Sequence, residues 1–117
     1  MKDQRIYCRD ILERTERIER YTIDGRETFL RSKLLQDGVI RSFEVIREAV
    51  KHLAPELINQ YPAVIWSDFA GFRDVLIHQY HKIRIDLVWD FAQEDLPPLK
   101  AATQAMLIQL ESQHTDE

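Results

Sequence analysis

The sequence is poor in the residues that break helices and cross-link chains. Its 117 residues include three Gly, four Pro and one Cys. Because Cys8 is the only cysteine, an intrachain disulfide and a site built from several thiolate ligands are both excluded. Few Gly and Pro, with 44% hydrophobic and 31% charged residues, argue against disorder and against a strand-and-turn sandwich. We therefore expect one compact helical domain over residues 1–117, and Cys8 as a small buried hydrophobe.

Long apolar runs are also missing. No segment approaches the roughly 20 apolar residues that a membrane-spanning helix needs. The first residues, 1–5, lack the apolar stretch of a signal peptide. These absences predict a protein that does not associate with membranes and that is cytoplasmic.

Positive charge is scarce in the second half of the chain. Residues 1–51 hold 12 Lys and Arg against 10 Asp and Glu, whereas residues 52–117 hold 4 against 10. The net charge of −4 disfavours sequence-independent binding over a broad basic face, because such binding depends on neutralising phosphates. Any contact with RNA must therefore be local.

Helical spacing of the apolar residues predicts four or five helices and no strand. The expected helices cover residues 4–22, about 27–53, a stretch from Trp66 or Ser67 through Tyr80, 86–94, and 99 to about 113. Pro55 and Pro62 bracket a further short helical turn, and Leu96-Pro97-Pro98 predicts a break. The fold class that follows is an all-α bundle, with Trp66 as a core anchor.

The most informative segment is Arg73-Asp-Val-Leu-Ile-His78-Gln-Tyr80. A guanidinium is always charged and its planar fork matches a phosphate. An imidazole can move a proton near neutral pH, and a phenol can donate, accept or be modified. The same three residues also fit an ordinary polar helix face, so the pattern alone leaves both interpretations open.

On a continuous helix these groups would not converge. Arg73 and His78 would differ by about 140° around the axis, whereas Asp74 would lie one turn from His78 and could orient its ring. Either the helix ends near His78, or a symmetric dimer brings arginine and histidine from two chains into one cleft. The dimer would also supply two His78 side chains. Cleaving RNA without a metal needs a base, an acid and a cation for the phosphorane, so two histidines could divide the proton transfers.

A metal site has weaker support. His78 and His81 are three residues apart, but no cysteine helps and Asp74 or Asp86 would have to complete the set. Paired histidines at this spacing arise often by chance. We expect no metal and no cofactor, and lone histidines such as His52 and His114 are expected to carry no special function.

The motif resembles the Arg-x4-His-x-Tyr signature of the HepT-like branch of the HEPN superfamily. The similarity extends in order along the chain, through Gln36–Arg41, Ile46–Ala49, Gln60–Trp66, Phe69–Arg73, Ile85–Trp89 and Asp95–Leu99. Members of that branch are toxin ribonucleases encoded beside minimal nucleotidyltransferases. The resemblance implies a HEPN-type bundle forming a symmetric homodimer, with the paired motifs lining a cleft at the interface.

The resemblance also implies a role for each residue of the motif. Arg73 and His78 would be the catalytic pair of a metal-independent endoribonuclease, with Asp74 in a supporting position. Tyr80 would be the tyrosine to which the nucleotidyltransferase antitoxin transfers AMP from ATP, silencing the toxin. RNA would be the substrate.

The chain departs from the family pattern at three positions. Gln79 and Arg47 stand where glycine is frequent, and Asp74 where asparagine is frequent. An aspartate beside the cleft adds negative charge where RNA must bind, which puts the efficiency of the site in doubt more than its identity. The alternative is a non-catalytic binding subunit or companion of a nucleotidyltransferase.

Overall fold

The computed structural model describes residues 3–72, 77–78 and 82–115, without the side chains of residues 77, 78, 82, 114 and 115. The helices are α1 (Gln4–Thr22), α2 (Arg26–Arg31), α3 (Lys33–Lys51), α4 (Pro55–Ile58), α5 (Trp66–Ala70), α7 (Ile85–Glu94) and α8 (Leu96–Thr115). Two short strands, β1 (Ile77–His78) and β2 (Lys82–Ile83), lie between α5 and α7. The predicted all-α bundle is confirmed, with one small antiparallel pairing added to it.

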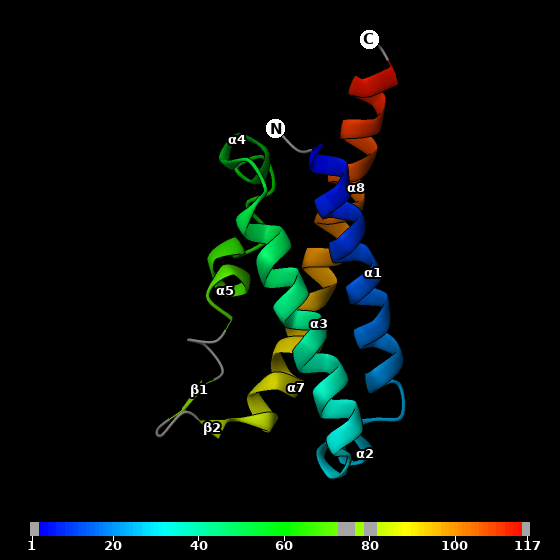
Figure 1. The fold of residues 1–117 in the computed structure, drawn as a ribbon, viewed down its shortest axis with the longest axis vertical. Helices are drawn as coiled ribbons and strands as arrows, with labels where there is room; N and C mark the ends of the chain where they lie inside the picture. Colours follow the sequence, from blue (N-terminus) through cyan, green and yellow to red (C-terminus); the bar gives the residue numbers. More distant parts are fainter. Residues whose placement is uncertain (1–2, 73–76, 79–81, 116–117) are drawn as a thin grey trace.

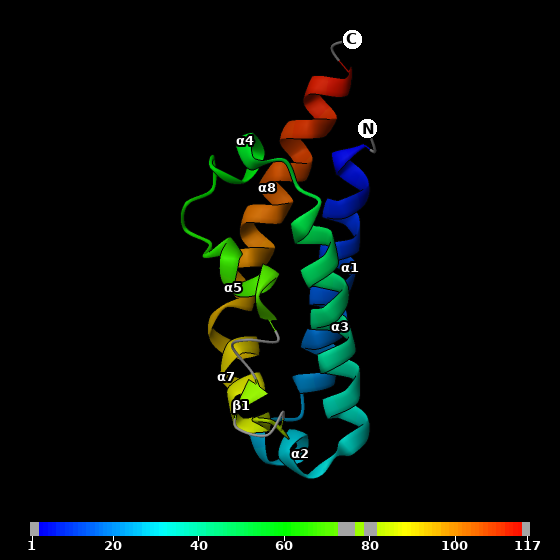
Figure 2. The same ribbon diagram turned by 60° about the vertical axis from the view of Figure 1, so that its left-hand side comes forward.

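Three long helices run along the molecule, which measures 50 × 28 × 23 Å. α1 packs against both α3 and α8, and α7 joins α3 to the lower part of α8 (Figure 1). The N-terminal end of α1 and the C-terminal end of α8 lie at the same end of the bundle (Figures 1 and 2). α5 and the two strands lie along one edge, beside α3. No helix in the described ranges is long and apolar enough to cross a membrane.

The predicted bounds of the first helix are confirmed by α1. The Asp3 carboxylate accepts a hydrogen bond from the backbone N–H of Arg5 at 2.9 Å, which caps the helix start. Ile11 and Ile18 are fully buried on its inner face. On its outer face, Glu13 and Arg17 form an i,i+4 ion pair at 2.8 Å.

The predicted single helix over residues 27–53 is wrong, because the chain breaks at Ser32. The hydroxyl of Ser32 accepts a hydrogen bond from the backbone N–H of Leu35 at 3.2 Å and so begins α3 as a new helix. Gln36, buried in α3, donates from its amide to the carbonyls of Phe29 and Leu30 at the end of α2. These bonds satisfy carbonyls that the break leaves without helical partners.

The predicted break between the last two helices is confirmed, but it falls at Asp95 and not over Leu96-Pro97-Pro98, because α8 begins at Leu96 and includes both prolines. A proline is tolerated in the first turn of a helix, where its missing N–H would have had no partner. The short turn after Pro55 is confirmed as α4, and the helix near residues 86–94 is confirmed as α7.

The continuous helix predicted through Tyr80 is wrong in its last part. α5 ends at Ala70, and Ile77–His78 pairs antiparallel with Lys82–Ile83. Ile77 lies opposite Ile83, and His78 lies opposite Lys82. Because Ile77–His78 lies in a strand, the angles of a continuous helix do not give the position of His78.

An aromatic cluster joins α3, α5 and α7. The ring of Phe43 lies 5.0 Å from those of Phe72 and Phe91, and Phe69 lies 4.9 Å from Phe91. All four side chains are buried. Trp66 is buried at the start of α5, as predicted, and its indole N–H donates to the carbonyl of Tyr61 at 3.0 Å.

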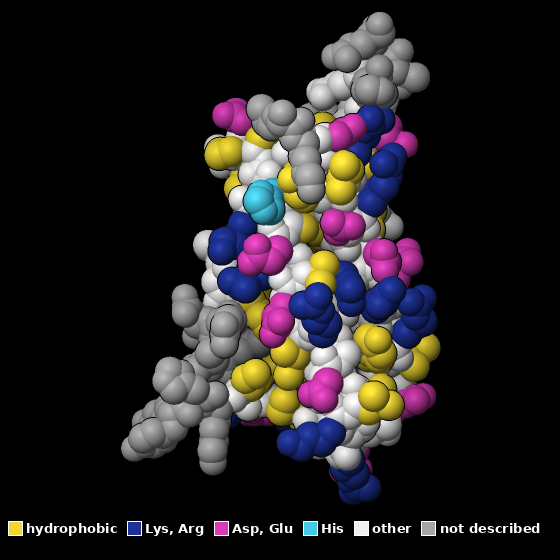
Figure 3. Space-filling view, in the orientation of Figure 1, with side chains coloured by type: hydrophobic (Ala, Val, Ile, Leu, Met, Phe, Trp, Pro, Cys, Tyr) yellow, Lys and Arg dark blue, Asp and Glu magenta, His cyan; other side chains and the backbone are white. Residues whose placement is uncertain are grey.

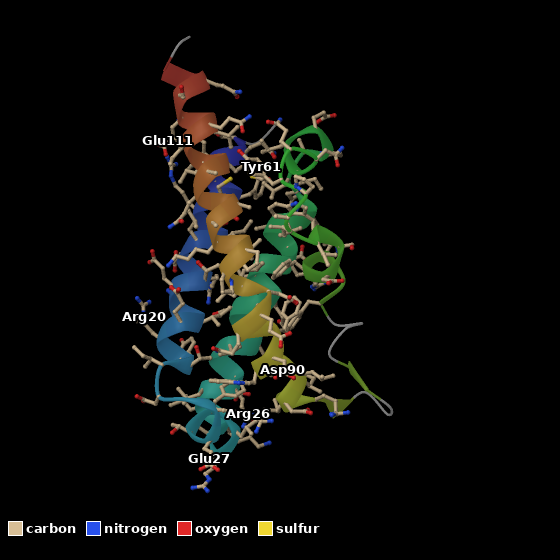
Figure 4. The ribbon with its side chains drawn as sticks, turned by 180° about the vertical axis from the view of Figure 1, so that it is seen from behind. Arg20, Arg26, Glu27, Tyr61, Asp90 and Glu111 are labelled. Atoms are coloured by element: carbon tan, nitrogen blue, oxygen red, sulfur yellow. The ribbon has the colours of Figure 1, made fainter. Side chains whose placement is uncertain are left out.

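The connection between α3 and α5 is tied to the long helices at two points. The side chain of Gln4 donates to the carbonyl of His52 at 3.1 Å and accepts from the N–H of Ala54 at 2.7 Å. The hydroxyl of Tyr61 donates to the side-chain oxygen of Gln109 in α8 at 2.5 Å, and Tyr61 is visible between these elements in Figure 4. The path from α3 to α5 is thus fixed on both sides.

Gly38 of α3 lies against the ring of Tyr21 in α1, and this contact gives a prediction about stability. A Cβ atom at position 38 would lie 2.7 Å from Cζ of Tyr21. We expect Gly38→Ala to destabilise the fold by roughly 1 kcal/mol, because displacing the Tyr21 ring outweighs the gain in helix propensity. In a Tyr21→Ala background the same substitution should stabilise by about 0.5–1 kcal/mol. Urea unfolding of the four proteins measures both effects, and a destabilisation of equal size in both backgrounds would contradict this contact.

Candidate functional site

The segment that carries Arg73, His78 and Tyr80 is anchored at both ends by the aromatic cluster. Phe72, immediately before Arg73, is buried against Phe43 and lies 6.1 Å from Phe91. On the other side of the segment, α7 begins at Ile85 and buries Val88 and Phe91. Both ends of the segment are therefore held on α3, which fixes where the motif enters and leaves the bundle.

The predicted site residues fall largely outside the described part of the chain. Arg73, Asp74 and Tyr80 lie outside the described residues, as do Gln79 and His81. Of His78 the backbone is described, in β1 opposite Lys82. What the structure adds is the position of the described residues next to them, with Phe72 packed on Phe43 of α3 and Ile77–His78 paired with Lys82–Ile83.

Arg84 is the first cation after the motif whose side chain the structure describes, and it is already paired. Its guanidinium donates from Nε to Oδ1 of Asp86 at 2.9 Å and from Nη2 to Oδ2 at 2.6 Å. These hydrogen bonds are the main reason why the pKa of Asp86 lies below its ordinary value. Because Asp86 neutralises Arg84, this arginine contributes little net positive charge near β2.

Two other recesses of the surface are less suited to RNA. Val64, Asp68, Phe69 and Asp95 line a cavity of about 70 Å³, far smaller than the roughly 300 Å³ or more of a typical ligand pocket. Burial, with the nearby Asp68 and Glu94 carboxylates, raises the pKa of Asp95. A broader groove at the upper end of α3 is lined by Tyr7, whose ring stacks on His52 at 5.2 Å and 14°.

The single thiol is buried, and the described His, Cys, Asp and Glu side chains form no metal-binding group. Cys8 is fully buried, as predicted, and burial raises the pKa of its thiol to about 11, so the thiol is unreactive at neutral pH. Over the described ranges 3–72, 77–78 and 82–115, no group of three or more His, Cys, Asp or Glu could hold a metal ion. Asp74 and His81 lie outside those ranges.

Charge on the visible face of the molecule is mixed. Figure 3 shows Lys and Arg side chains interspersed with Asp and Glu over α1 and α3, with no broad basic surface on this side. This agrees with the expectation that contact with RNA would be local. An RNA phosphate would therefore be bound by individual cations near the motif.

The helical fold and the family match together identify the class of protein to which the chain belongs. The chain is a helical bundle with an Arg, His and Tyr segment at one edge, between α5 and α7. The model of the family described as "Ribonuclease HepT-like" matches residues 11–106, which include the whole motif. The chain belongs to this HepT-like family of the HEPN superfamily.

Relatives from two archaea support the assignment. A protein of Methanocaldococcus jannaschii, provisionally named as an RNase, is 44% identical over 97 residues, 82% of this chain and 80% of the relative. The "Probable ribonuclease HepT" of Thermococcus cleftensis is 38% identical over 95 residues, covering 80% of this chain and 86% of that protein.

A third relative is much longer than this chain. It is a Methanocaldococcus jannaschii protein named as a gamma-glutamylcyclotransferase and, provisionally, as an RNase, and it is 45% identical over 100 residues. The match covers 85% of this chain and 45% of that protein. No solved structure matches the chain significantly.

Proposed function

We propose that this chain is a metal-independent RNA endonuclease and the toxin of a toxin-antitoxin pair. The observation that carries the proposal is the family match over residues 11–106, together with the anchoring of both ends of the motif on α3. Arg73 and His78 are the proposed catalytic residues, with Asp74 in support. The acting form is a homodimer in which two motifs face one cleft.

The proposed reaction needs one proton removed and one delivered. One His78 takes the proton of a ribose 2′-hydroxyl, and the 2′-oxygen attacks the adjacent phosphorus. Arg73 stabilises the negative charge of the phosphorane. The second His78 donates a proton to the departing 5′-oxygen, which leaves a 2′,3′-cyclic phosphate and a 5′-hydroxyl.

Tyr80 is the proposed control point. A nucleotidyltransferase antitoxin transfers AMP from ATP to its phenol oxygen and releases pyrophosphate. The adduct adds a negatively charged phosphodiester two residues from His78, where it repels or displaces an RNA phosphate. The modified toxin is therefore inactive.

Cleavage in the presence of EDTA tests the proposal. The purified dimer is expected to cut labelled RNA at the same rate with and without EDTA, and the products should carry 2′,3′-cyclic phosphate ends. An inactive protein that still binds a nucleotidyltransferase encoded by a neighbouring gene would favour the alternative of a non-catalytic binding subunit. Dependence on added Mg²⁺ or Mn²⁺ would contradict the metal-independent mechanism.

The role of Tyr80 has its own test. Incubation with the nucleotidyltransferase, ATP and Mg²⁺ should add the mass of AMP to the chain and stop cleavage. Tyr80→Phe should gain no mass and should stay active in the same mixture. Equal mass gain by both proteins would place the modification elsewhere.

A further inference from the structure

Arg47 is a largely buried cation with an unused hydrogen-bond donor. Its side chain is 25% exposed, and its Nε–H is buried with no hydrogen-bond partner in the part of the chain that the structure describes. Its one ion pair joins Nη2 to Oε1 of the adjacent Glu48 at 3.3 Å. Glu48 is 57% exposed, so water screens this pair and the pair adds little.

The position of Arg47 on α3 places it on the side of α5. Gly38 faces α1, because Tyr21 lies against it, whereas Phe43 faces α5 through its contact with Phe72. At 3.6 residues per turn, Arg47 lies about 180° around the helix from Gly38 and about 40° from Phe43. Arg47 is therefore one turn beyond the contact that anchors the start of the motif.

A second cation extends this side of the helix. Lys51 is exposed and lies one further turn along α3, about 6 Å beyond Arg47 along the axis. Lys and Arg side chains are visible along the edge of α3 that borders α5 in Figure 3. Arg47 and Lys51, with Glu48 between them, form the α3 strip, which begins one turn beyond the contact of Phe43 with Phe72.

A buried guanidinium N–H without an acceptor is costly, and the guanidinium cannot lose its charge. An anion with two adjacent oxygens would first meet the exposed part of the guanidinium, and a shift of the 57% exposed Glu48 side chain would then let Nε and one Nη donate to it in parallel. A phosphate meets this requirement. A single-stranded backbone that follows the α3 strip would offer successive phosphates to Arg47 and Lys51.

We propose that Arg47 is an RNA-binding residue that holds a backbone phosphate near the one that is cut. The proposal rests on the ribonuclease function proposed above and adds to it a phosphate subsite on α3. Because the chain has a net charge of −4, each cation that contacts RNA matters, and the loss of the Arg47 donor should lower the affinity for RNA measurably.

Binding to an RNA that cannot be cut isolates this role. A fluorescein-labelled, fully 2′-O-methylated RNA of mixed sequence lacks the 2′-hydroxyl nucleophile, and fluorescence anisotropy gives its Kd at several salt concentrations. Arg47→Gln is expected to raise Kd about tenfold and to reduce the slope of log Kd against log salt by about 0.7. Arg47→Lys should keep the slope and recover part of the affinity, because it keeps the charge and loses the fork.

Arg20→Gln is the matched control, since it removes the same charge elsewhere. Arg20 is exposed near the end of α1 and points away from the bundle on the edge opposite β1 and β2 (Figure 4). For Arg20→Gln, Kd should stay within twofold of the wild-type value. The slope of log Kd against log salt should equal the wild-type slope within error. An equal effect of the two variants would mean a general charge effect and would overturn the subsite.

Two further outcomes separate this proposal from the proposed function. If wild type cuts RNA and Arg47→Gln binds and cuts as well as wild type, the subsite is wrong and the ribonuclease stands. If no protein cuts RNA but Arg47→Gln alone loses affinity, the ribonuclease is wrong and the subsite stands. Sedimentation of the folded variant completes the test, because a loss of dimer with unchanged RNA affinity would assign Arg47 to a carboxylate of the second copy.

Discussion

His78→Ala is expected to lower kcat/KM for RNA cleavage by about 10²–10⁴-fold, the range that a general acid–base residue contributes. Because His78 is proposed to act as base in one protomer and as acid in the other, both roles are lost in the mutant dimer. Arg73→Ala should lower kcat by about 10²–10³-fold through the loss of phosphorane stabilisation. Both rates are measured under single-turnover conditions with an end-labelled RNA.

His52→Ala is the control for removing an imidazole. His52 stacks on Tyr7 at the far end of α3 from the contact between Phe43 and Phe72. Its substitution should leave cleavage within about twofold of wild type, as expected for a change away from the reacting groups. Undiminished cleavage by His78→Ala would remove His78 from the mechanism, whatever His52→Ala does.

Mixed dimers test whether the site is shared between chains. If one site needs Arg73 from one protomer and a single His78 from the other, a dimer of one Arg73→Ala and one His78→Ala chain keeps one intact site. Random exchange of subunits makes half of the dimers mixed, so about a quarter of the wild-type activity should return. If both His78 side chains serve one cleft, no activity returns. A site made from one chain alone would also stay inactive, so a return of activity would show an Arg73–His78 site shared between chains and would contradict the two-histidine mechanism.

The sequence predicted helices best where local signals and apolar spacing agree. α1 begins after a capping aspartate and keeps its apolar spacing to Thr22, so its bounds matched. The break at Ser32 was missed because the apolar stripe runs on from Phe29 into α3, and only the capping serine marks the new start. The prolines of α8 were interpreted as breakers although they occupy the first turn, where proline is compatible with a helix.

For the candidate site, the sequence predicted residue types better than backbone geometry. Residue types pointed to Arg73, His78 and Tyr80 as candidates, and the family resemblance supplied the roles that are now proposed for them. The straight helix assumed for them failed at Ile77–His78, where pairing with Lys82–Ile83 prevails over the helical spacing. Short apolar runs fit either structure, so tertiary contacts decide between them.

In the sequence, Arg47 is distinguished only by standing where the family pattern has a frequent glycine. Its Nε–H is buried without a partner in the described part of the chain, on a helix that packs against segments distant in sequence such as α5. Apolar periodicity indicates which face of α3 is buried, but it does not indicate which polar group beside that face is left without an acceptor. That information required the packed structure.

Phe43→Ala is expected to destabilise the domain by about 3–5 kcal/mol, a large share of the roughly 5–15 kcal/mol that holds a domain of this size together. Phe43 is 1% exposed and its ring contacts those of Phe72 and Phe91, so its removal opens a cavity where α3, α5 and α7 meet. Urea unfolding followed by circular dichroism measures the change, with the slope of the transition checked for two-state behaviour.

The same substitution should affect the site as well as the fold. Phe72 precedes Arg73, and its packing on Phe43 is one of the two contacts that anchor the motif, so the folded fraction of Phe43→Ala should cut RNA more slowly than wild type. Leu34→Ala is the matched control on the same helix. Leu34 is 80% exposed, so the cost should stay within about 0.5 kcal/mol and cleavage should not change. A loss of stability in Phe43→Ala without any loss of activity per folded molecule would mean that the aromatic cluster stabilises the bundle but does not position the motif.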